Sequence, residues 1–180
     1  DDCLFVGNSA HGGGGFIFED CSPSVTGCTF VGNSAAWGGA GYCNAGANPA
    51  ITASTFHENS STNGGMAMSV VGSHPVLTQV LLTDQEGSGD LIACVSGTTV
   101  DLDCCNIYGN TGGDYTSCLS GQLGVDGNIS ADPMYCPDNG PEEFAIHSSS
   151  PCAEDQSACG LIGAWPVGCG PQTYVVKDDG

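Results

Sequence analysis

The chain has 180 residues and a formal net charge of −19, because 20 acidic side chains stand against a single basic one. This acidity disfavours nucleic acids and anionic membrane surfaces as partners, and no apolar run approaches the roughly 20 residues of a membrane-spanning helix. Twelve cysteines without a tight metal-binding spacing indicate disulfides formed in an oxidising compartment. We therefore expect a secreted protein, extracellular or at the cell surface, that inserts into no membrane.

One short sequence recurs along the chain. It is clearest at residues 28–35, Cys-Thr-Phe-Val-Gly-Asn-Ser-Ala, with a near copy at residues 2–10 and looser copies at residues 54–60 and 105–110. Every repeat has an amide residue at the same place, at steps of 25 or 26 residues: Asn8, Asn33, Asn59, Gln85 and Asn110. A constant step of this length predicts a solenoid in which each repeat forms one coil.

Within each repeat we expect three short strands separated by Gly, Pro and Asn corners. The first follows a glycine pair, as in residues 14–18, the second follows a proline, as in residues 23–26, and the third is the Cys-Thr-Phe-Val stretch. The small residues between the amide and the glycines are expected to form a loop. The glycine content argues against helices, and the constant step argues against a β-sandwich. The pattern therefore predicts an all-β solenoid of parallel coils.

Stacked coils place equivalent residues directly above one another, about 4.8 Å apart. We expect the apolar residues at one position to form an interior ladder: Phe5, Phe30, Phe56, Leu82 and Ile107. The amide residues are expected to form a second ladder at a corner, where each side chain bonds to the next coil. Ligand contact is the alternative role for this row, but a tight corner needs such hydrogen bonds in every coil.

Stacking also predicts disulfides between coils, since Cα atoms about 5 Å apart lie within bonding reach. Three pairs fall at matching or neighbouring positions: Cys3 with Cys28, Cys94 with Cys118, and Cys21 with Cys43. Cys104 and Cys105 are adjacent, so they should point to opposite sides of their strand and need different partners. The sequence leaves open how the remaining four pair: Cys136, Cys152, Cys159 and Cys169.

The repeat loses its period after Asn110. We expect residues 1–130 to form the coils and residues 131–170 to form a last coil with a disulfide-rich cap, because an open solenoid end exposes core and strand edges. Residues 171–180 are polar and are expected to be a tail or linker. Because residue 1 falls inside a repeat, we interpret the sequence as a piece of a longer exported protein.

With these residues laid out, the chain resembles the right-handed parallel β-helix repeats of secreted and surface-exposed bacterial proteins. The resemblance rests on Cys-x-Phe-x-x-Asn-x-Ala followed by glycines, and on residues 104–115, 132–136, 150–152 and 159–164. These later segments look like the last coils of large extracellular proteins, which often continue into a C-terminal sorting domain that this sequence lacks. The resemblance implies a right-handed β-helix of about 25 to 26 residues per coil and export. It transfers no catalytic residue.

Some parallel β-helices act on polysaccharides, so paired carboxylates are the enzymatic candidates. A glycoside hydrolase needs two of them about 5 to 10 Å apart. Asp90 and Asp114 are placed one coil apart, and Asp101 and Asp103 should project from one strand face. Asp90 and Asp114, together with backbone carbonyls, are also the candidates for a calcium site. The histidines share no repeat position and predict no metal or catalytic cluster: His11, His57, His74 and His147.

Trp37, among Ala and Gly in an expected loop, is the candidate for contact with a sugar or a partner. A threonine row of Thr26, Thr52 and Thr78 is too short to favour ice binding. We therefore expect a non-catalytic structural or adhesive module that joins copies of itself into surface filaments or binds a cell-surface partner. The alternative is a domain that binds or hydrolyses polysaccharide. Apart from the calcium candidate, no cofactor is expected.

Overall fold

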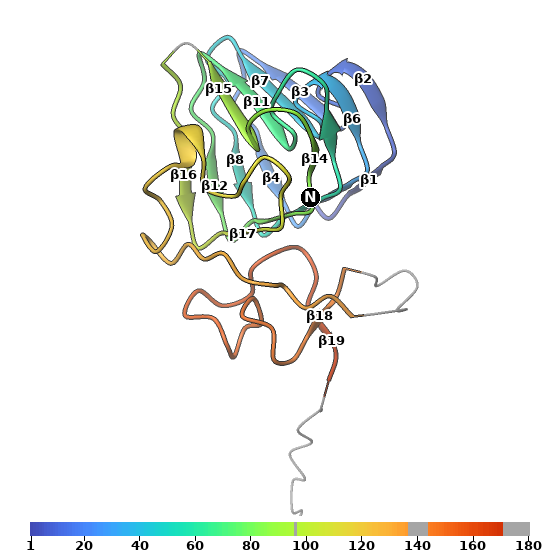
Figure 1. Cartoon of the computed structure of the whole chain (residues 1–180), viewed down its shortest axis with the longest axis vertical. Helices are drawn as coiled ribbons and strands as arrows, with labels where there is room; N and C mark the ends of the chain where they lie inside the picture. The colour runs from blue at the N-terminus through green and yellow to red at the C-terminus, as the bar shows by residue number, and fades with distance from the viewer. Residues whose placement is uncertain (96, 137–143, 171–180) are drawn as a thin grey trace, which may run out of the picture.

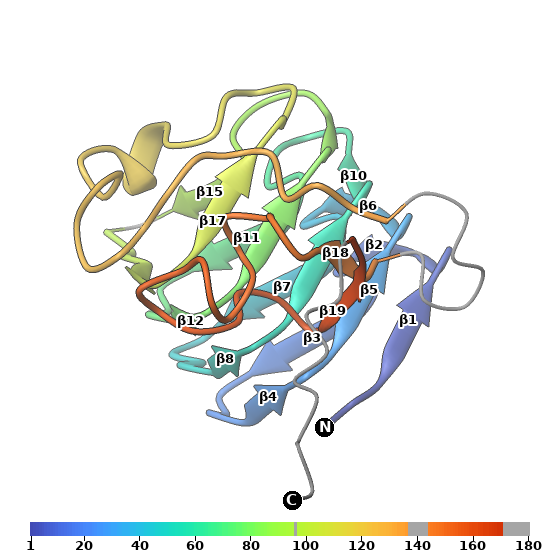
Figure 2. The ribbon, with the colours of Figure 1, turned by 90° about the horizontal axis from the view of Figure 1, so that it is seen from below.

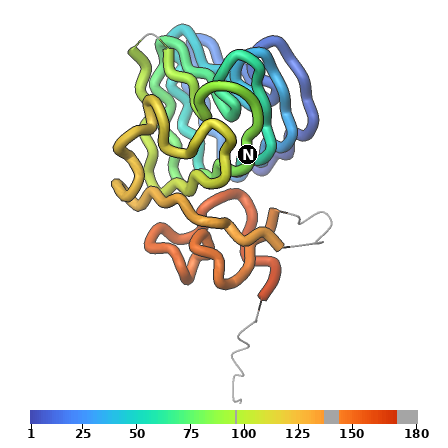
Figure 3. Tube along the Cα trace, viewed as in Figure 1, coloured from blue at the N-terminus to red at the C-terminus, as the bar shows by residue number. Residues whose placement is uncertain are grey.

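The chain forms a parallel β-solenoid in the computed structural model, which describes residues 1–95, 97–136 and 144–170 (Figures 1 and 3). Each coil adds one strand to each of four sheets, and consecutive strands of a sheet are one coil apart in the sequence. Every pairing within these four sheets is parallel. The predicted all-β solenoid is therefore confirmed.

The four sheets, here called A to D, are listed in coil order. Sheet A contains β1 (Leu4–Val6), β5 (Thr29–Val31), β9 (Thr55–His57), β13 (Leu81–Thr83) and β17 (Asn106–Tyr108). Sheet B contains β2 (Ser9–Gly12), β6 (Ser34–Trp37), β10 (Ser60–Ser61) and β14 (Glu86–Gly87). Sheet C contains β3 (Phe16–Glu19), β7 (Gly41–Asn44), β11 (Met68–Val71) and β15 (Ile92–Val95). Sheet D contains β4 (Ser24–Thr26), β8 (Ala50–Thr52), β12 (Val76–Thr78) and β16 (Asp101–Asp103).

The first four coils therefore have four strands each, where the sequence predicted three. The additional strand, in sheet B, is the stretch of small residues after the amide, which we expected to be a loop. Ser34 in this stretch pairs with Ser9 of the preceding coil and Ser60 of the following one. Ladder hydrogen bonds from both neighbouring coils hold this segment extended, although Ser, Ala and Gly have little strand propensity of their own.

The interior of sheet A follows the predicted apolar ladder. Phe5, Phe30 and Phe56 stand in register, and their rings stack with centroids 4.9 and 4.7 Å apart. Leu82 and Ile107 continue the row and are fully buried. Since each apolar side chain lies directly on the next, the coil-to-coil contact is the core of the protein.

The recurring glycine pairs are explained by how closely the coils approach at one corner. A Cβ on Gly14 would collide with the carbonyl oxygen of Gly39, and a Cβ on Gly39 would collide with that of Met66. Only residues without a side chain fit here, so the glycines set the position of this corner in successive coils.

Residues 113–130 cover the end of the last coil. Leu119, in the 3-10 helix η1 (Ser117–Leu119), is buried in the solenoid core, and Cys118 is bonded to Cys94 of β15. Ile129 pairs with Asn106 of β17 as a further rung of sheet A. This end is therefore closed by a segment that precedes the one we expected to form the cap.

The C-terminal residues turn back and lie along the outer face of sheet A (Figure 2). They include the short pair β18 (Ile146–His147) and β19 (Val167–Cys169). Their contacts move along the sheet from β17 to β5, through Asn106–Cys152, Leu81–Ile162, Thr55–Ala164 and Thr29–Trp165. The predicted disulfide-rich C-terminal segment is present, and it covers a flank of the solenoid.

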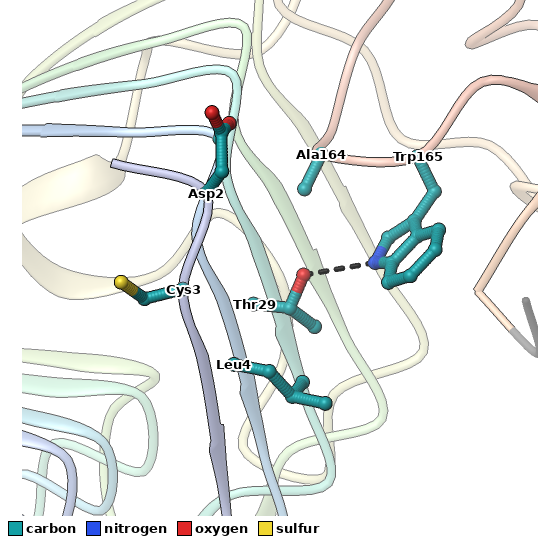
Figure 4. A pocket seen from close by; sticks show the side chains of 7 residues that line it. Asp2, Cys3, Leu4, Thr29, Ala164 and Trp165 are labelled. Carbon is teal, nitrogen blue, oxygen red and sulfur yellow. Dashed lines mark hydrogen bonds between the residues drawn. The ribbon is translucent and has the colours of Figure 1, made fainter. Parts of the chain in front are cut away.

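The cover ends at Trp165, whose Nε1 donates to Thr29 Oγ1 at 2.9 Å (Figure 4). Beyond it, a shallow groove of about 250 Å³ separates Trp165 from the start of β1, where Leu4 is 58% exposed. Among the described residues, none covers the outer face of the first coil as the C-terminal segment covers the later coils. Residues 171–180, the expected tail, lie outside the described residues.

Candidate functional site

The predicted amide ladder is present: side chains bond to each other from Asn8 to Asn59, and backbone N–H groups donate to the side chains of Gln85 and Asn110. The backbone N and Nδ2 of Asn8 both donate to Asn33 Oδ1, at 3.0 and 2.9 Å, and those of Asn33 donate in the same way to Asn59 Oδ1. The ladder continues from Asn59 to Gln85 and from Gln85 to Asn110. Each inner amide also donates to a backbone carbonyl, as Asn59 does to Phe30. These buried amides are bonded within the solenoid, which favours the structural role over ligand contact.

Asp114, a candidate for both catalysis and calcium binding, ends this ladder. Its Oδ1 accepts from the backbone N of Asn110 at 3.1 Å and from Asn110 Nδ2 at 2.9 Å. This is the pair of bonds that an amide oxygen of a next coil would accept. Its Oδ2 accepts from Ser130 Oγ at 3.1 Å. Asp114 therefore substitutes for the missing sixth amide.

Asp90, the proposed partner of Asp114, takes part in the solenoid through its backbone. Its carbonyl oxygen accepts from the amides of Gly65 and Met66, both at 3.1 Å. Among the residues that the structure describes, no three His, Cys, Asp or Glu side chains are grouped so that they could hold a metal ion. The calcium site stays a sequence-based hypothesis without a described ligand set.

Asp101 and Asp103 project from the same face of β16, as predicted, with Leu102 buried between them. Asp103 continues the threonine row, since it pairs with Thr78, which pairs with Thr52. Both carboxylates are exposed on the outer surface of sheet D. That position fits a solvated face better than a sugar-binding cleft.

The cysteines follow the predictions only in part. The Cys94–Cys118 disulfide is confirmed, with Cα atoms 6.1 Å apart. Cys104 is bonded to Cys159, whereas its neighbour Cys105 is a buried free thiol, so the two do have different surroundings. Of the other cysteines whose pairing the sequence left open, Cys136 is bonded to Cys169, and Cys152 is a buried free thiol.

The predicted bonds between Cys3 and Cys28 and between Cys21 and Cys43 are wrong, because all four are free. Cys3 and Cys28 are stacked and project in the same direction, whereas a disulfide needs its two side chains to turn toward each other. Cys43 is buried and in register with Phe18, whereas Cys21 lies beyond the end of that strand and is exposed. Cys3 and Cys28 instead donate to nearby carbonyls of their own coils. Burial raises the pKa of Cys43 to about 12, so this thiol stays protonated and unreactive at neutral pH.

Trp37 is 40% exposed at the end of β6, where we expected a loop. It stands in register with Gly12 of the preceding coil, on the outer side of sheet B. It therefore remains a surface aromatic side chain without a partner among the described hydrogen bonds and ring contacts.

Comparison of equivalent repeat positions did not predict a group of side chains around His57. His57 Nδ1 lies 2.9 Å from Thr83 Oγ1, which lies 2.8 Å from the Tyr135 hydroxyl. The imidazole also packs edge-on against the rings of Tyr135 and Phe144, each with centroids 5.3 Å away. His57 thus joins the outer face of sheet A to the C-terminal segment.

Two carboxylates flank this histidine, Glu58 Oε1 at 3.5 Å from Nε2 and Asp84 Oδ2 at 3.6 Å from Nδ1. Both residues have left-handed backbone angles, with φ of 51° and 54°, at the corner where other coils have Gly7, Gly32 and Gly109. A carboxylate at a position that favours glycine is a sequence signal for this group, and we did not use it. His57 and Glu58 line a groove of about 250 Å³ with Val31, Tyr135 and Phe144.

Burial raises the pKa of the Asp84 carboxyl. His57 opposes this shift, whereas the nearby carboxylates of Glu58, Asp132 and Asp114 add to it. Burial likewise raises the pKa of Tyr135, so its hydroxyl stays protonated and bonded to Thr83. The groove therefore holds a neutral phenol, and the Asp84 carboxyl beside His57 has a pKa above its ordinary value.

Evidence for a function comes from the fold and these side chains, because comparisons with known proteins add none. No protein-family model, curated protein or solved structure was found to match this chain. Across the described residues, no helix has the length and apolar character to cross a bilayer.

Proposed function

We propose that this chain is a non-catalytic structural or adhesive module of an extracellular protein. The observation that carries the proposal is the unbroken hydrogen-bonded ladder from Asn8 to Asp114, in which a leading catalytic candidate serves as the last rung. The other predicted pair, Asp101 and Asp103, lies on an exposed face of β16. The carboxylates predicted as catalytic candidates thus either bond within the coils or face solvent.

The extracellular setting is supported by the disulfides. Cys94–Cys118 ties the last coil to its cover, and Cys104–Cys159 and Cys136–Cys169 hold the C-terminal segment. Such bonds persist in oxidising compartments. The more specific assignment, a right-handed β-helix of the bacterial surface type, rests on the resemblance of the repeat.

Filament formation by a solenoid requires ends through which copies can join head to tail. Residues 113–130 cover one of these ends, so such a joint would require their displacement. In our proposal, contacts with other molecules use the N-terminal end and the outer sheet faces, including the exposed Trp37.

A polysaccharide-active domain is the second candidate, and we propose the surroundings of His57 as its site. Asp84, with its raised pKa, and Glu58 flank His57, which lies in a groove lined by Tyr135 and Phe144, so these two carboxylates are the acid and carboxylate pair of this candidate.

A hydrolysis screen separates the two functions. The purified chain is incubated with a panel of neutral and acidic polysaccharides, and new reducing ends are measured for the wild type and for Asp84→Asn, with Asp101→Asn as the matched surface control. The structural module predicts no reducing ends from any of the three proteins. Activity that Asp84→Asn abolishes and Asp101→Asn retains would establish the second candidate instead.

A further inference from the structure

We propose that Asn63 is a site of spontaneous covalent modification, at which the side-chain amide is converted to a carboxylate through a cyclic imide formed with the backbone nitrogen of Gly64. The two residues lie at the corner of the third coil between β10 of sheet B and β11 of sheet C. The reactants are the chain itself and water. The inference is independent of whether the module is adhesive or acts on polysaccharide.

The first argument is that a glycine follows Asn63. The backbone nitrogen of glycine is the least hindered nucleophile for closing an imide ring, because glycine has no Cβ. An Asn-Gly pair occurs twice in the sequence, at residues 63–64 and 139–140, and the second pair lies outside the described residues. Gly64 has a φ of 120°, a backbone angle that glycine adopts more readily than other residues. The local chain therefore offers little steric resistance to ring closure.

The second argument is that the Asn63 side chain is free to turn toward the backbone. It is exposed and makes no hydrogen bond with any described residue. A bonded amide must give up its hydrogen bonds before its Cγ can approach the next backbone nitrogen. Hydrogen bonds hold the side chains of all the other asparagines in the described part of the chain: Asn8, Asn33, Asn44, Asn48, Asn59, Asn106, Asn110 and Asn128.

The third argument is that the Gly64 nitrogen has no acceptor. Gly13 and Gly38, which stand at the equivalent position in the first and second coils, donate to the carbonyls of Trp37 and Gly64 in the next coil, at 2.9 and 3.3 Å. No carbonyl of a described residue accepts from Gly64, although this residue is buried. The nucleophile therefore gives up no hydrogen bond within the protein when its proton leaves.

The reaction balances without an oxidant or a reductant. The Gly64 nitrogen attacks Asn63 Cγ, the bond from Cγ to Nδ2 breaks, and Nδ2 leaves as ammonia with the proton of Gly64. Water then opens the imide at one of its two carbonyls. Opening at Cγ gives aspartate, whereas opening at the backbone carbonyl of Asn63 gives isoaspartate, in which Cβ becomes part of the main chain. Because Asn63 is exposed, water has access to the imide.

The added main-chain atom of isoaspartate falls between two hydrogen bonds that hold this corner. The amide of Asn63 donates to the Ala36 carbonyl at 3.0 Å, and the carbonyl of Gly64 accepts from the Gly38 amide at 3.3 Å. Lengthening the chain between Asn63 and Gly64 moves these two groups out of register with their partners. Isoaspartate should therefore loosen the corner beside the exposed Trp37, whereas aspartate adds only a carboxylate there.

To test the proposal, the folded full chain is incubated at physiological temperature over a series of mildly acidic to mildly alkaline pH values. Asn139→Gln is made in every protein, so that residues 63–64 are the Asn-Gly pair that is followed. Peptide mapping by mass spectrometry measures the loss of each asparagine and separates aspartate from isoaspartate. Asn63→Gln, which keeps an amide but closes a larger ring more slowly, is the matched control, and Asn63→Asp reproduces one of the two products.

We expect Asn63 to be lost at least about tenfold faster than any other described asparagine, because its reacting groups alone are held by no hydrogen bond. The rate should rise with pH, since the Gly64 nitrogen must lose its proton. Loss of Asn63 no faster than that of Asn106, which is bonded to Ala131, would overturn the proposal.

The structural consequence is measured on the separated products by urea unfolding. The isoaspartate form should unfold at a lower urea concentration than the Asn63→Gln control, whereas Asn63→Asp should unfold close to it. An isoaspartate form as stable as the control would show that the corner accommodates the longer main chain, and it would overturn this consequence.

Discussion

The two ends of the solenoid differ in how the last coil is finished. At the C-terminal end, side chains imitate the next coil: Asp114 accepts the bonds of Asn110, Asn128 Oδ1 accepts the Cys105 amide at 2.9 Å, and Leu119 completes the core. At the N-terminal end, Asn8 and Phe5 have no such substitutes among the described residues. A solenoid end is therefore closed by a few well-placed acceptors and one apolar side chain, without another full coil.

The largest expected effect is a difference in stability loss between a substitution in the middle of the amide ladder and one at its open end. Asn59→Leu removes the acceptor of two Asn33 donors and the donor to Phe30, all buried, and should cost at least about 3 kcal/mol of unfolding free energy. Asn8→Leu removes one side-chain bond at the exposed end and should cost less than about 1 kcal/mol. Urea unfolding measures both. Equal losses would mean that the first coil is as well supported as the third.

The disulfide at the closed end should contribute nearly as much. Replacing both Cys94 and Cys118 by Ser releases the cover of the last coil and should cost about 3 kcal/mol, as expected for a bond that closes a loop of 24 residues. Cys3→Ser, at the open end, should change stability by less than about 0.5 kcal/mol. The measurement is again urea unfolding under non-reducing conditions. An unchanged double variant would show that residues 113–130 hold their place without the bond.

A smaller effect tests whether Asp114 acts as a hydrogen-bond acceptor. Asp114→Ala leaves the two Asn110 donors without their partner and should cost about 1 to 3 kcal/mol. Asp114→Asn keeps an Oδ1 acceptor and should lose less than half of that amount. If both variants are equally destabilised, the negative charge rather than the acceptor geometry closes the ladder.

The smallest expected effect concerns Asp84, on the covered flank between the two ends. Burial raises its pKa in the folded state above the ordinary value of 3.8, so the folded protein holds this proton more tightly than the unfolded chain. Stability should therefore fall as pH rises through the interval from 3.8 to the raised pKa. Asp84→Asn, which also tolerates the left-handed backbone, should stabilise the protein at neutral pH by less than about 1 kcal/mol, because the carboxyl is half exposed.

Thermal unfolding across pH checks this prediction, with Asp101→Asn as the surface control. The advantage of Asp84→Asn should disappear below pH 3.8, where both states of the wild type bind the proton. A variant that is less stable at neutral pH would show that the ion pair with His57 outweighs the cost of burial.

The interior of the coils was predictable because a constant period converts sequence positions directly into contacts. Phe30 must lie on Phe5, and Asn33 must bond to Asn59, once the step of 25 or 26 residues is known. The same reasoning failed for Cys3 and Cys28, because equal position gives proximity without the orientation that a disulfide needs.

The covered flank was not predictable from the period. Its contacts join residues 109 and 136 positions apart, Thr55 with Ala164 and Thr29 with Trp165, and nothing in the repeat distinguishes these threonines from solvent-facing ones. His57 was set aside because it has no counterpart in other coils, yet its partners come from three different parts of the chain. Carboxylates at the glycine corner, Glu58 and Asp84, were the available signal.

Residue-resolved hydrogen exchange of the backbone amides tests most directly whether the two ends of the solenoid differ. The amides of Leu4, Ser9 and Ser24 should exchange at nearly unprotected rates, because no carbonyl of the described residues accepts from them. Those of Leu102, Cys105 and Ile107 should be strongly protected, because they donate to Gln122 Oε1, Asn128 Oδ1 and the Ile129 carbonyl. Equal protection at the two ends, or faster exchange at the C-terminal end, would contradict an open N-terminal and a closed C-terminal end.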